Sequence, residues 1–220
     1  MIKDIHPTGS SNPKELTILN PSQLFFTAFN PDFGEELYVS TGDVGSATLV
    51  KDISPGQRSS SPHNLTPFKG KLYFFADDMF TDLWVSSGTA QSTQKVFDWP
   101  ANGPHGLDRL LTNVDDKLLF FIGGNSPSGS LWISDGTEAG TKKIHELNPD
   151  NYYSAGLDDF EVTYARSFNG KFVFVLNDGT HGFEVWASDG TTAGTKLLKD
   201  ISDVDAYRPH SFVELNGSLY

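Results

Sequence analysis

The segment LWISDGTEAGTKKI at residues 131–144 decides the fold, because the chain repeats it. A close copy, VWASDGTTAGTKLL, occupies residues 185–198, and two more divergent copies, LYVSTGDVGSATLV and LWVSSGTAQSTQKV, begin at residues 37 and 83. The aromatic residues of the motif are Tyr38, Trp84, Trp132 and Trp186. Successive copies are therefore 46, 48 and 54 residues apart. A period of about 40 to 50 residues with strand-like content is typical of propellers.

Four strand patterns recur in each unit. In the third unit they are RLLTNV, KLLFFIG, SLWIS and TKKIHEL, and in the fourth ARSF, KFVFVL, FEVWAS and TKLLKDI. The second pattern is almost continuously apolar, as expected of a strand buried on both faces, and the last is more polar, as expected of an exposed outer strand. No stretch shows helical periodicity with caps. The sequence therefore predicts an all-β β-propeller of four-stranded antiparallel blades. An open β-solenoid is the alternative, although solenoid coils are usually shorter.

The ends of the chain resemble parts of one further unit. The ending KDI of the outer strand occurs at residues 51–53 and 199–201, and also at residues 3–5, while LNGSLY near the C-terminus matches an inner hairpin. We expect a single propeller domain or segment over residues 1–220, with four complete blades and a fifth that lacks its third strand. The expected boundaries are units at 14–53, 62–98, 104–146 and 163–201, and a partial fifth blade from 1–5 and 209–220. Open edges predict self-association, or a place within a longer repeat protein.

The motif's turn explains the repetition structurally. Glycine supplies a positive φ that few other residues accept, and an aspartate before it can accept hydrogen bonds from the turn's own backbone. The residues assigned to this role are Gly42, Gly88, Asp135, Gly136, Asp189 and Gly190. The large aromatic residue before the turn can pack between neighbouring blades. A calcium site is the alternative, but the turns lack the dense carboxylate spacing of a calcium loop. We therefore expect no cofactor, with loosely held calcium as the open possibility.

Composition limits the classes of partner. The 220 residues carry a formal net charge of −12, which argues against nucleic acid and against an anionic membrane surface. The absence of cysteine excludes a disulfide framework, a thiolate zinc site and a cysteine nucleophile. No apolar run approaches about 18 residues, so no membrane insertion is expected. The start, MIKDIHPTGS, lacks the apolar region of a signal peptide, which leaves a cytosolic protein or a segment of a longer exported chain.

The pattern LW-x-SDGT-x-AGT, with KDI closing the unit, resembles the ELWxxDGTxxGT tandem-repeat family, some of whose members are described as hyalin-like. The resemblance covers nearly the whole chain. It is close at 131–144 and 169–201, and it is degraded at 37–53 and 87–93. The family implies a propeller-like module of exported bacterial proteins, hence secretion or the cell surface. It implies no defined catalytic residues.

Candidate binding residues lie in the loops opposite the motif's turn, which differ in length and sequence. Variable loops on a rigid scaffold are where binding usually occurs. Pro-His pairs recur just before the inner strands, and His63, His105 and His210 could converge near the central channel, although local packing is the simpler reading. Aromatic and amide residues suit the faces and hydroxyls of sugars, although they could simply cover the blades. These residues are Trp99, Asn102, Tyr152, Tyr153 and Tyr207.

Three functions remain open on the sequence. The first is a non-catalytic binding or adhesion module that recognises a glycan or a protein through the variable loops. The second is a polysaccharide-acting hydrolase or lyase with its site over the channel. The third is a structural spacer. No nucleophile elbow, HExxH, P-loop or dinucleotide fingerprint occurs, and no catalytic residue is assigned.

Overall fold

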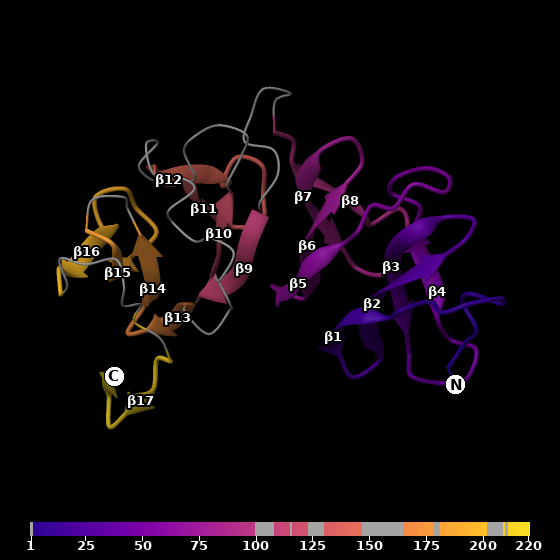
Figure 1. Cartoon of the computed structure of the whole chain (residues 1–220), viewed down its shortest axis with the longest axis horizontal. Coiled ribbons are helices and arrows are strands. Elements are labelled where there is room, and N and C mark those ends of the chain that lie inside the picture. Colours follow the sequence, from indigo (N-terminus) through magenta and orange to yellow (C-terminus); the bar gives the residue numbers. More distant parts are fainter. Residues whose placement is uncertain are drawn as a thin grey trace. The chain divides into compact units, whose positions relative to one another are not determined.

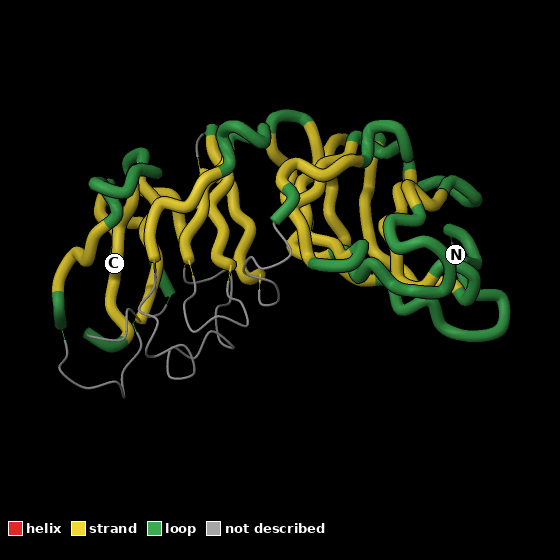
Figure 2. Tube along the Cα trace, turned by 90° about the horizontal axis from the view of Figure 1, so that it is seen from above, coloured by secondary structure: helices red, strands yellow, loops and turns green. Residues whose placement is uncertain are grey.

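The computed structural model describes residues 2–99, 108–114, 116–122, 130–146, 165–177, 181–201, 209 and 211–220. This part of the chain is built of strands joined by turns and loops, and it contains no helix (Figure 2). It accordingly contains no helix long and apolar enough to cross a membrane. The chain forms two compact units, each of which is described by itself.

The first unit contains two four-stranded antiparallel sheets, labelled in Figure 1. Their strands follow chain order, so each sheet is one blade of the expected kind. Blade 1 consists of β1 (Lys14–Asn20), β2 (Gln23–Asn30), β3 (Gly34–Ser40) and β4 (Thr48–Lys51). Blade 2 consists of β5 (His63–Phe68), β6 (Lys71–Asp77), β7 (Thr81–Ser86) and β8 (Gln94–Phe97).

The second unit contains two further blades and a short hairpin. Blade 3 consists of β9 (Asp108–Val114), β10 (Lys117–Ile122), β11 (Ser130–Ser134) and β12 (Lys142–Glu146). Blade 4 consists of β13 (Ala165–Phe168), β14 (Lys171–Asn177), β15 (Phe183–Ser188) and β16 (Lys196–Lys199). The hairpin pairs β17 (Glu214–Leu215) with β18 (Ser218–Leu219), where the sequence predicts the inner hairpin of a fifth blade.

All four blades share one register. The motif's aromatic residue on the third strand always pairs with a phenylalanine on the second strand. The pairs are Phe26 with Tyr38, Phe74 with Trp84, Phe120 with Trp132, and Phe174 with Trp186. The described residues therefore form four complete blades of an all-β protein of the β-propeller class, as the repeat predicts.

Within each unit the two blades pack face to face. Phe25 of blade 1 and Phe74 of blade 2 belong to one buried cluster, and Phe121 of blade 3 packs against Phe174 of blade 4 with ring centroids 5.6 Å apart. The motif's tryptophan takes part: the Trp84 ring lies 5.3 Å from Lys51 Nζ, on the outer strand of the preceding blade. Trp186 likewise lies 5.3 Å from the ring of His145 on β12. The predicted packing of these tryptophans between blades is confirmed.

The SDGT turn is held by a buried pair of hydroxyl groups. The serine that ends the third strand bonds to the serine or threonine that precedes or begins the outer strand. The four pairs are Ser40–Ser46, Ser86–Thr93, Ser134–Thr141 and Ser188–Thr195, at 2.6 to 2.8 Å. Gly42, Gly88, Gly136 and Gly190 all have φ between 83° and 96°, as the sequence predicts. The turn's geometry is thus the same in all four blades.

Residues near each end of the described chain pack on a blade, on the face that does not contact the other blade of the same unit. Ile5 packs with Phe26 and Tyr38 on blade 1, and Phe212 packs with Val173 and Val175 on blade 4. Residues 2–5 form no strand. The assignment of residues 1–5 and 209–220 to one fifth blade stays a prediction.

Candidate functional site

A cavity of about 370 Å³ lies between the N-terminal segment, residues 2–13, and the loop that joins β2 to β3. The segment contributes Lys3, Asp4, Ile5, Pro7 and Thr8, the loop contributes Asn30, Pro31, Asp32 and Phe33, and blade 1 contributes Tyr38 and Leu49. Pockets for small molecules usually measure about 300–1,000 Å³, so this volume is at the lower end of that range. The β2–β3 loop is one of the variable loops in which the sequence predicts binding.

The N-terminal wall of the cavity is tied to blade 1. Lys3 Nζ donates a hydrogen bond to Ala47 O at 2.9 Å, and the backbone N–H of Gly45 donates to Ile2 O at 2.5 Å. The side chain of Asn30 joins the two walls, because its amide nitrogen donates to Ile5 O at 2.8 Å while its oxygen accepts the N–H of Asp32 at 2.8 Å. The cavity is therefore largely preformed.

Tyr38 distinguishes this blade from the other three, which carry tryptophan. Its side chain is only 4% exposed, its ring stacks on Phe26, and its hydroxyl has no hydrogen-bond partner among the described residues. In blades 2 and 3, by contrast, Trp84 Nε1 donates to Ala76 O at 3.1 Å and Trp132 Nε1 to Ser130 Oγ at 2.8 Å, while in blade 4 the buried Trp186 Nε1 has no partner among the described residues. Burial, and then the charge of Glu36, raise the pKa of Tyr38, so the hydroxyl remains a protonated donor at neutral pH. A hydroxyl without a protein partner at a cavity wall is suited to a ligand's polar group.

The rest of the cavity combines an apolar surface with carboxylates. The Phe33 side chain is 36% exposed and lies beside Pro31. The carboxylates of Asp4 and Asp32 are exposed and form no ion pair with any residue in the described ranges. An aromatic ring next to acceptors and a hydroxyl can hold a molecule that has both an apolar face and hydroxyl groups.

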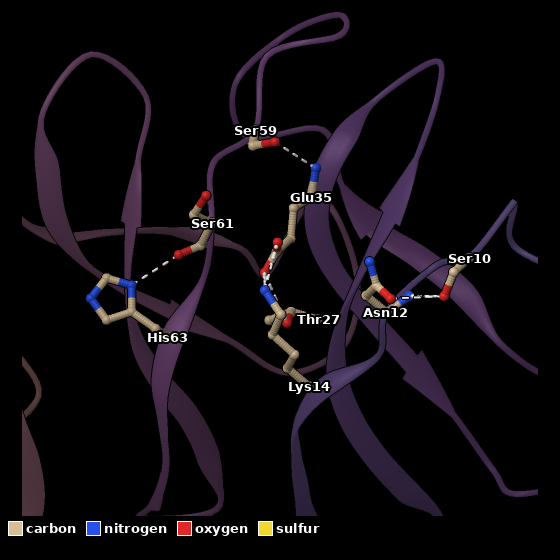
Figure 3. Close-up of polar contacts among 8 residues, drawn as sticks. All are labelled: Ser10, Asn12, Lys14, Thr27, Glu35, Ser59, Ser61 and His63. Carbon is tan, nitrogen blue, oxygen red and sulfur yellow. Dashed lines mark hydrogen bonds and ion pairs between the residues drawn. The ribbon is translucent and has the colours of Figure 1, made fainter. Parts of the chain in front are cut away.

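A polar network fixes the neighbouring rim of the unit (Figure 3). Lys14 Nζ forms an ion pair with Glu35 at 3.2 Å, and the Thr27 hydroxyl donates to the same carboxylate at 3.4 Å. The backbone N–H of Glu35 donates to Ser59 Oγ at 2.9 Å, which ties β3 to the connection between the blades. The network therefore holds the start of β3, directly after the β2–β3 loop, to β1, β2 and the connection between the blades.

His63 begins β5 and is held locally. Its Nδ1 donates to Ser61 O at 2.9 Å, as Figure 3 shows, and its ring contacts Phe75 with centroids 6.0 Å apart. The strand start is irregular: the register shifts between His63 and Thr66, and Asn64 has a φ of 55°. Glu15 and Ser211 occupy the same place after their proline and also have positive φ. The histidine therefore belongs to a repeated strand start, in line with the local reading.

Trp99 is the other predicted binding residue that the structure describes. It is 3% exposed and contacts Phe97 edge-on at 4.9 Å, so it offers no free ring face to a ligand. The remaining predicted residues lie outside the described part of the chain: Asn102, His105, Tyr152, Tyr153, Tyr207 and His210. The convergence of the three histidines stays a prediction.

Sequence reasoning missed a set of buried carboxylates two residues before the motif's aromatic residue. Glu36, Asp82 and Glu184 each accept a hydrogen bond from the backbone N–H 17 residues later, at 3.0 to 3.2 Å. The donors are Ile53, Trp99 and Ile201, which follow the outer strand of the same blade. These acids anchor the connection that leaves the blade, which is a structural role. Their constant spacing from the aromatic residue was the available signal.

Glu36 carries the largest share of such bonds. It also accepts the backbone N–H of Ser54 and Ser60 and the hydroxyl of Ser60. Burial nevertheless outweighs these bonds, which lower the pKa, and raises the pKa of Glu36 to about 7. No lysine or arginine forms an ion pair with this carboxylate among the described residues.

The acidic cluster of blade 2 surrounds a lysine. Lys95 Nζ lies 2.7 Å from Asp82, 2.9 Å from Asp78 and 3.0 Å from Asp98. Burial alone would lower the pKa of Lys95, but its hydrogen bonds to Asp82, Asp78 and Asp98 outweigh burial and raise it. One ammonium group thus pairs with three carboxylates, of which only Asp82 is buried. Within the described ranges, no group of three or more histidine, cysteine or acidic side chains could hold a metal ion.

The chain matches no protein-family model and no curated protein. It is similar to solved structures. A mutant of puromycin hydrolase complexed with PGG has a TM-score of 0.54 and 14% identity over 96% of this chain and 32% of that one. A Mycobacterium tuberculosis puromycin-hydrolyzing peptidase has a TM-score of 0.54 and 16% identity over 88% and 30%. An α-L-arabinofuranosidase from Podospora anserina in complex with cellotriose gives a TM-score of only 0.42 and 13% identity over 89% and 70%, too distant to bear on function.

The chain therefore spans about a third of the length of these two puromycin-hydrolysing proteins. At such identities the likeness is one of fold alone. It agrees with the repeated register and the four-stranded sheets in assigning this chain to the β-propeller class.

Proposed function

We propose that this chain is a non-catalytic binding module that recognises a glycan through its variable loops, with the cavity on blade 1 as a contact site. One observation carries the proposal: the cavity places an exposed phenylalanine, two carboxylates without ion pairs among the described residues and a tyrosine hydroxyl without a partner there together on one surface. A sugar ring offers an apolar face for the aromatic ring and hydroxyl groups for the acceptors and donors.

Binding without catalysis is favoured by the chemistry of the described residues. A glycosidase needs a pair of carboxyl groups at a defined separation across the bond to be broken, with one of them kept protonated. Asp4 and Asp32 are both exposed, and no feature of the described residues gives one of them the buried surroundings that keep a general acid protonated. Glu36 is the carboxylic acid whose pKa is strongly raised, but its side chain is buried and already accepts hydrogen bonds from backbone N–H groups.

We also propose that the module is secreted or displayed at the cell surface. The support is the resemblance of its repeats to those of exported tandem-repeat proteins. Fractionation of the producing cells, followed by detection with an antibody to this chain, tests the setting directly. Detection in the cytosol alone would contradict it.

Glycan-array binding and polysaccharide affinity electrophoresis test the function. We expect retention by at least one class of polysaccharide, with no release of reducing sugars during prolonged incubation. Release of reducing sugars at enzyme-like rates would overturn the non-catalytic assignment. Failure to bind any glycan, with a folded protein shown by thermal melting, would overturn the proposal as a whole.

A further inference from the structure

We infer that the cavity on blade 1 takes a neutral saccharide ring, and that Tyr38 is the residue that determines its specificity. This inference rests on the proposed function and deepens it, because it assigns the ligand's charge class and a recognition group. Its starting point is a departure from the repeat: blade 1 carries tyrosine where the other three blades carry tryptophan, and this tyrosine lines the cavity.

The exchange changes both volume and chemistry at that position. In blades 2 and 4 the tryptophan ring is covered by a residue of the preceding blade's outer strand, Lys51 over Trp84 and His145 beside Trp186. On blade 1 the N-terminal segment and the cavity occupy that side instead. A phenol is smaller than an indole, so tyrosine leaves room there. It also provides a hydroxyl that can both donate and accept, whereas the indole N–H only donates.

The charges around the cavity select against acidic ligands. Two carboxylates, Asp4 and Asp32, face one cation, Lys3, and the Lys3 ammonium already donates to Ala47 O. A uronate or sulfated sugar would therefore meet net negative charge, in a chain whose formal net charge is −12. Neutral hydroxyl groups instead suit carboxylate acceptors, because charge-assisted hydrogen bonds are stronger than neutral ones.

The size of the cavity limits the ligand to a short contact. A volume of about 370 Å³ is small for a long oligosaccharide, and Phe33 in the lining of the cavity is partly exposed to solvent. We therefore place one or two sugar rings in it, with the apolar face of a ring on Phe33 and a hydroxyl group against Tyr38. Asn30 acts as a positioning residue, since its side chain holds both walls.

The experiment compares variants of the whole chain by calorimetric titration and saturation-transfer NMR. The probes are methyl glycosides of neutral hexoses and pentoses, together with glucuronate and galacturonate. Tyr38→Phe removes only the hydroxyl, and we expect it to weaken binding of the preferred neutral glycoside about five- to tenfold, the effect of one hydrogen bond. Tyr38→Trp installs the residue of the other blades, and we expect it to abolish binding while the melting temperature is kept.

Phe33→Ala and Phe80→Ala form a matched pair. Both phenylalanines lie in the loop between the second and third strands of their blades, and they are similarly exposed, at 36% and 38%. Only Phe33 lines the cavity. We expect Phe33→Ala to weaken binding about tenfold or more and Phe80→Ala to leave it unchanged. The reason is that a sugar ring in the cavity can stack on Phe33 but not on Phe80.

The outcomes separate this inference from the function on which it rests. The inference is supported if neutral glycosides bind and their binding is weakened by Tyr38→Phe and Phe33→Ala but not by Phe80→Ala. A chain that binds glycans equally well with all cavity variants, or that prefers uronates, overturns the inference and keeps the binding function. A folded chain that binds no saccharide in any form overturns both.

Discussion

The carboxylate of Asp189 fills the space that a side chain at position 194 would need. A Cβ atom added to Gly194 would lie 2.0 Å from Asp189 Oδ1. That oxygen accepts the N–H and the hydroxyl of Thr191, at 2.9 and 2.7 Å. The aspartate and the second glycine of the SDGTxxGT motif are thus one unit, since the acid that ties the turn together leaves no room for a Cβ.

Blade 2 shows the same turn with both positions exchanged. Ser87 stands where the aspartate would be, and Ser92 stands where the glycine would be. Ser92 Oγ now accepts the backbone N–H and the hydroxyl of Thr89, at 3.2 and 2.9 Å. In blade 4 the accepting oxygen belongs to a residue before the threonine, and in blade 2 it belongs to a residue after it. What looks like a degraded repeat in the sequence is a compensated one in the structure.

Gly194→Ser should destabilise the protein on its own, by about 1–3 kcal/mol, because the added side chain collides with the Asp189 carboxylate. The double variant Asp189→Ser with Gly194→Ser reproduces the arrangement of blade 2 and should recover most of that loss. Urea denaturation of the wild type, both single variants and the double variant measures the coupling. Strictly additive effects would refute the compensation.

Lys95→Ala should destabilise the protein by about 3 kcal/mol, since it leaves the buried Asp82 without its cation. The matched control is Lys14→Ala, which removes a lysine from the exposed pair with Glu35 and should cost at most about 1 kcal/mol. Thermal melting of both variants at one pH makes the comparison. Equal losses of stability in the two variants would show that the buried Asp82–Lys95 pair contributes no more than the exposed Lys14–Glu35 pair.

Glu36 should make stability depend on pH near neutrality. Its pKa is about 7 in the folded protein against 4.5 for the unperturbed group, so the folded chain retains a proton that the unfolded chain releases. The contribution of Glu36 to the free energy of unfolding is therefore full below about pH 4.5 and declines as pH rises towards 7, by roughly 3 kcal/mol in total. Denaturation at pH 5 and pH 8 should show a smaller decline for Glu36→Gln than for the wild type. The same decline in both would contradict the assignment.

We propose that the hairpin β17–β18 mediates self-association. A two-stranded sheet is marginal by itself, and Val213, Leu215 and Tyr220 are exposed. Replacing Leu215 and Tyr220 with aspartate should reduce the associated fraction in light scattering without lowering the melting temperature. Val44→Asp, at a residue that is 88% exposed elsewhere, is the control for the change in charge. A wild-type chain that is monomeric at every concentration would refute the proposal.

The sequence by itself determined the repeat, the four strands of each blade and the positive φ of the motif's glycines. These features are local: alternation of apolar residues, a turn glycine and a fixed period can all be read along the chain. The packing of Trp84 and Trp186 between blades followed from the same reasoning, because a large residue recurring in one register must meet the next repeat.

Tertiary structure decided what lies between distant segments. Asn30 joins residues 5 and 32, Glu36 binds a backbone group 17 positions away, and Lys95 forms ion pairs with Asp78, Asp82 and Asp98. Trp99 was predicted to offer a binding surface, yet it is buried against Phe97. The exchange of tryptophan for Tyr38 is visible in the sequence, but its meaning is not. Whether a side chain meets a neighbour or a cavity depends on residues brought together only by folding.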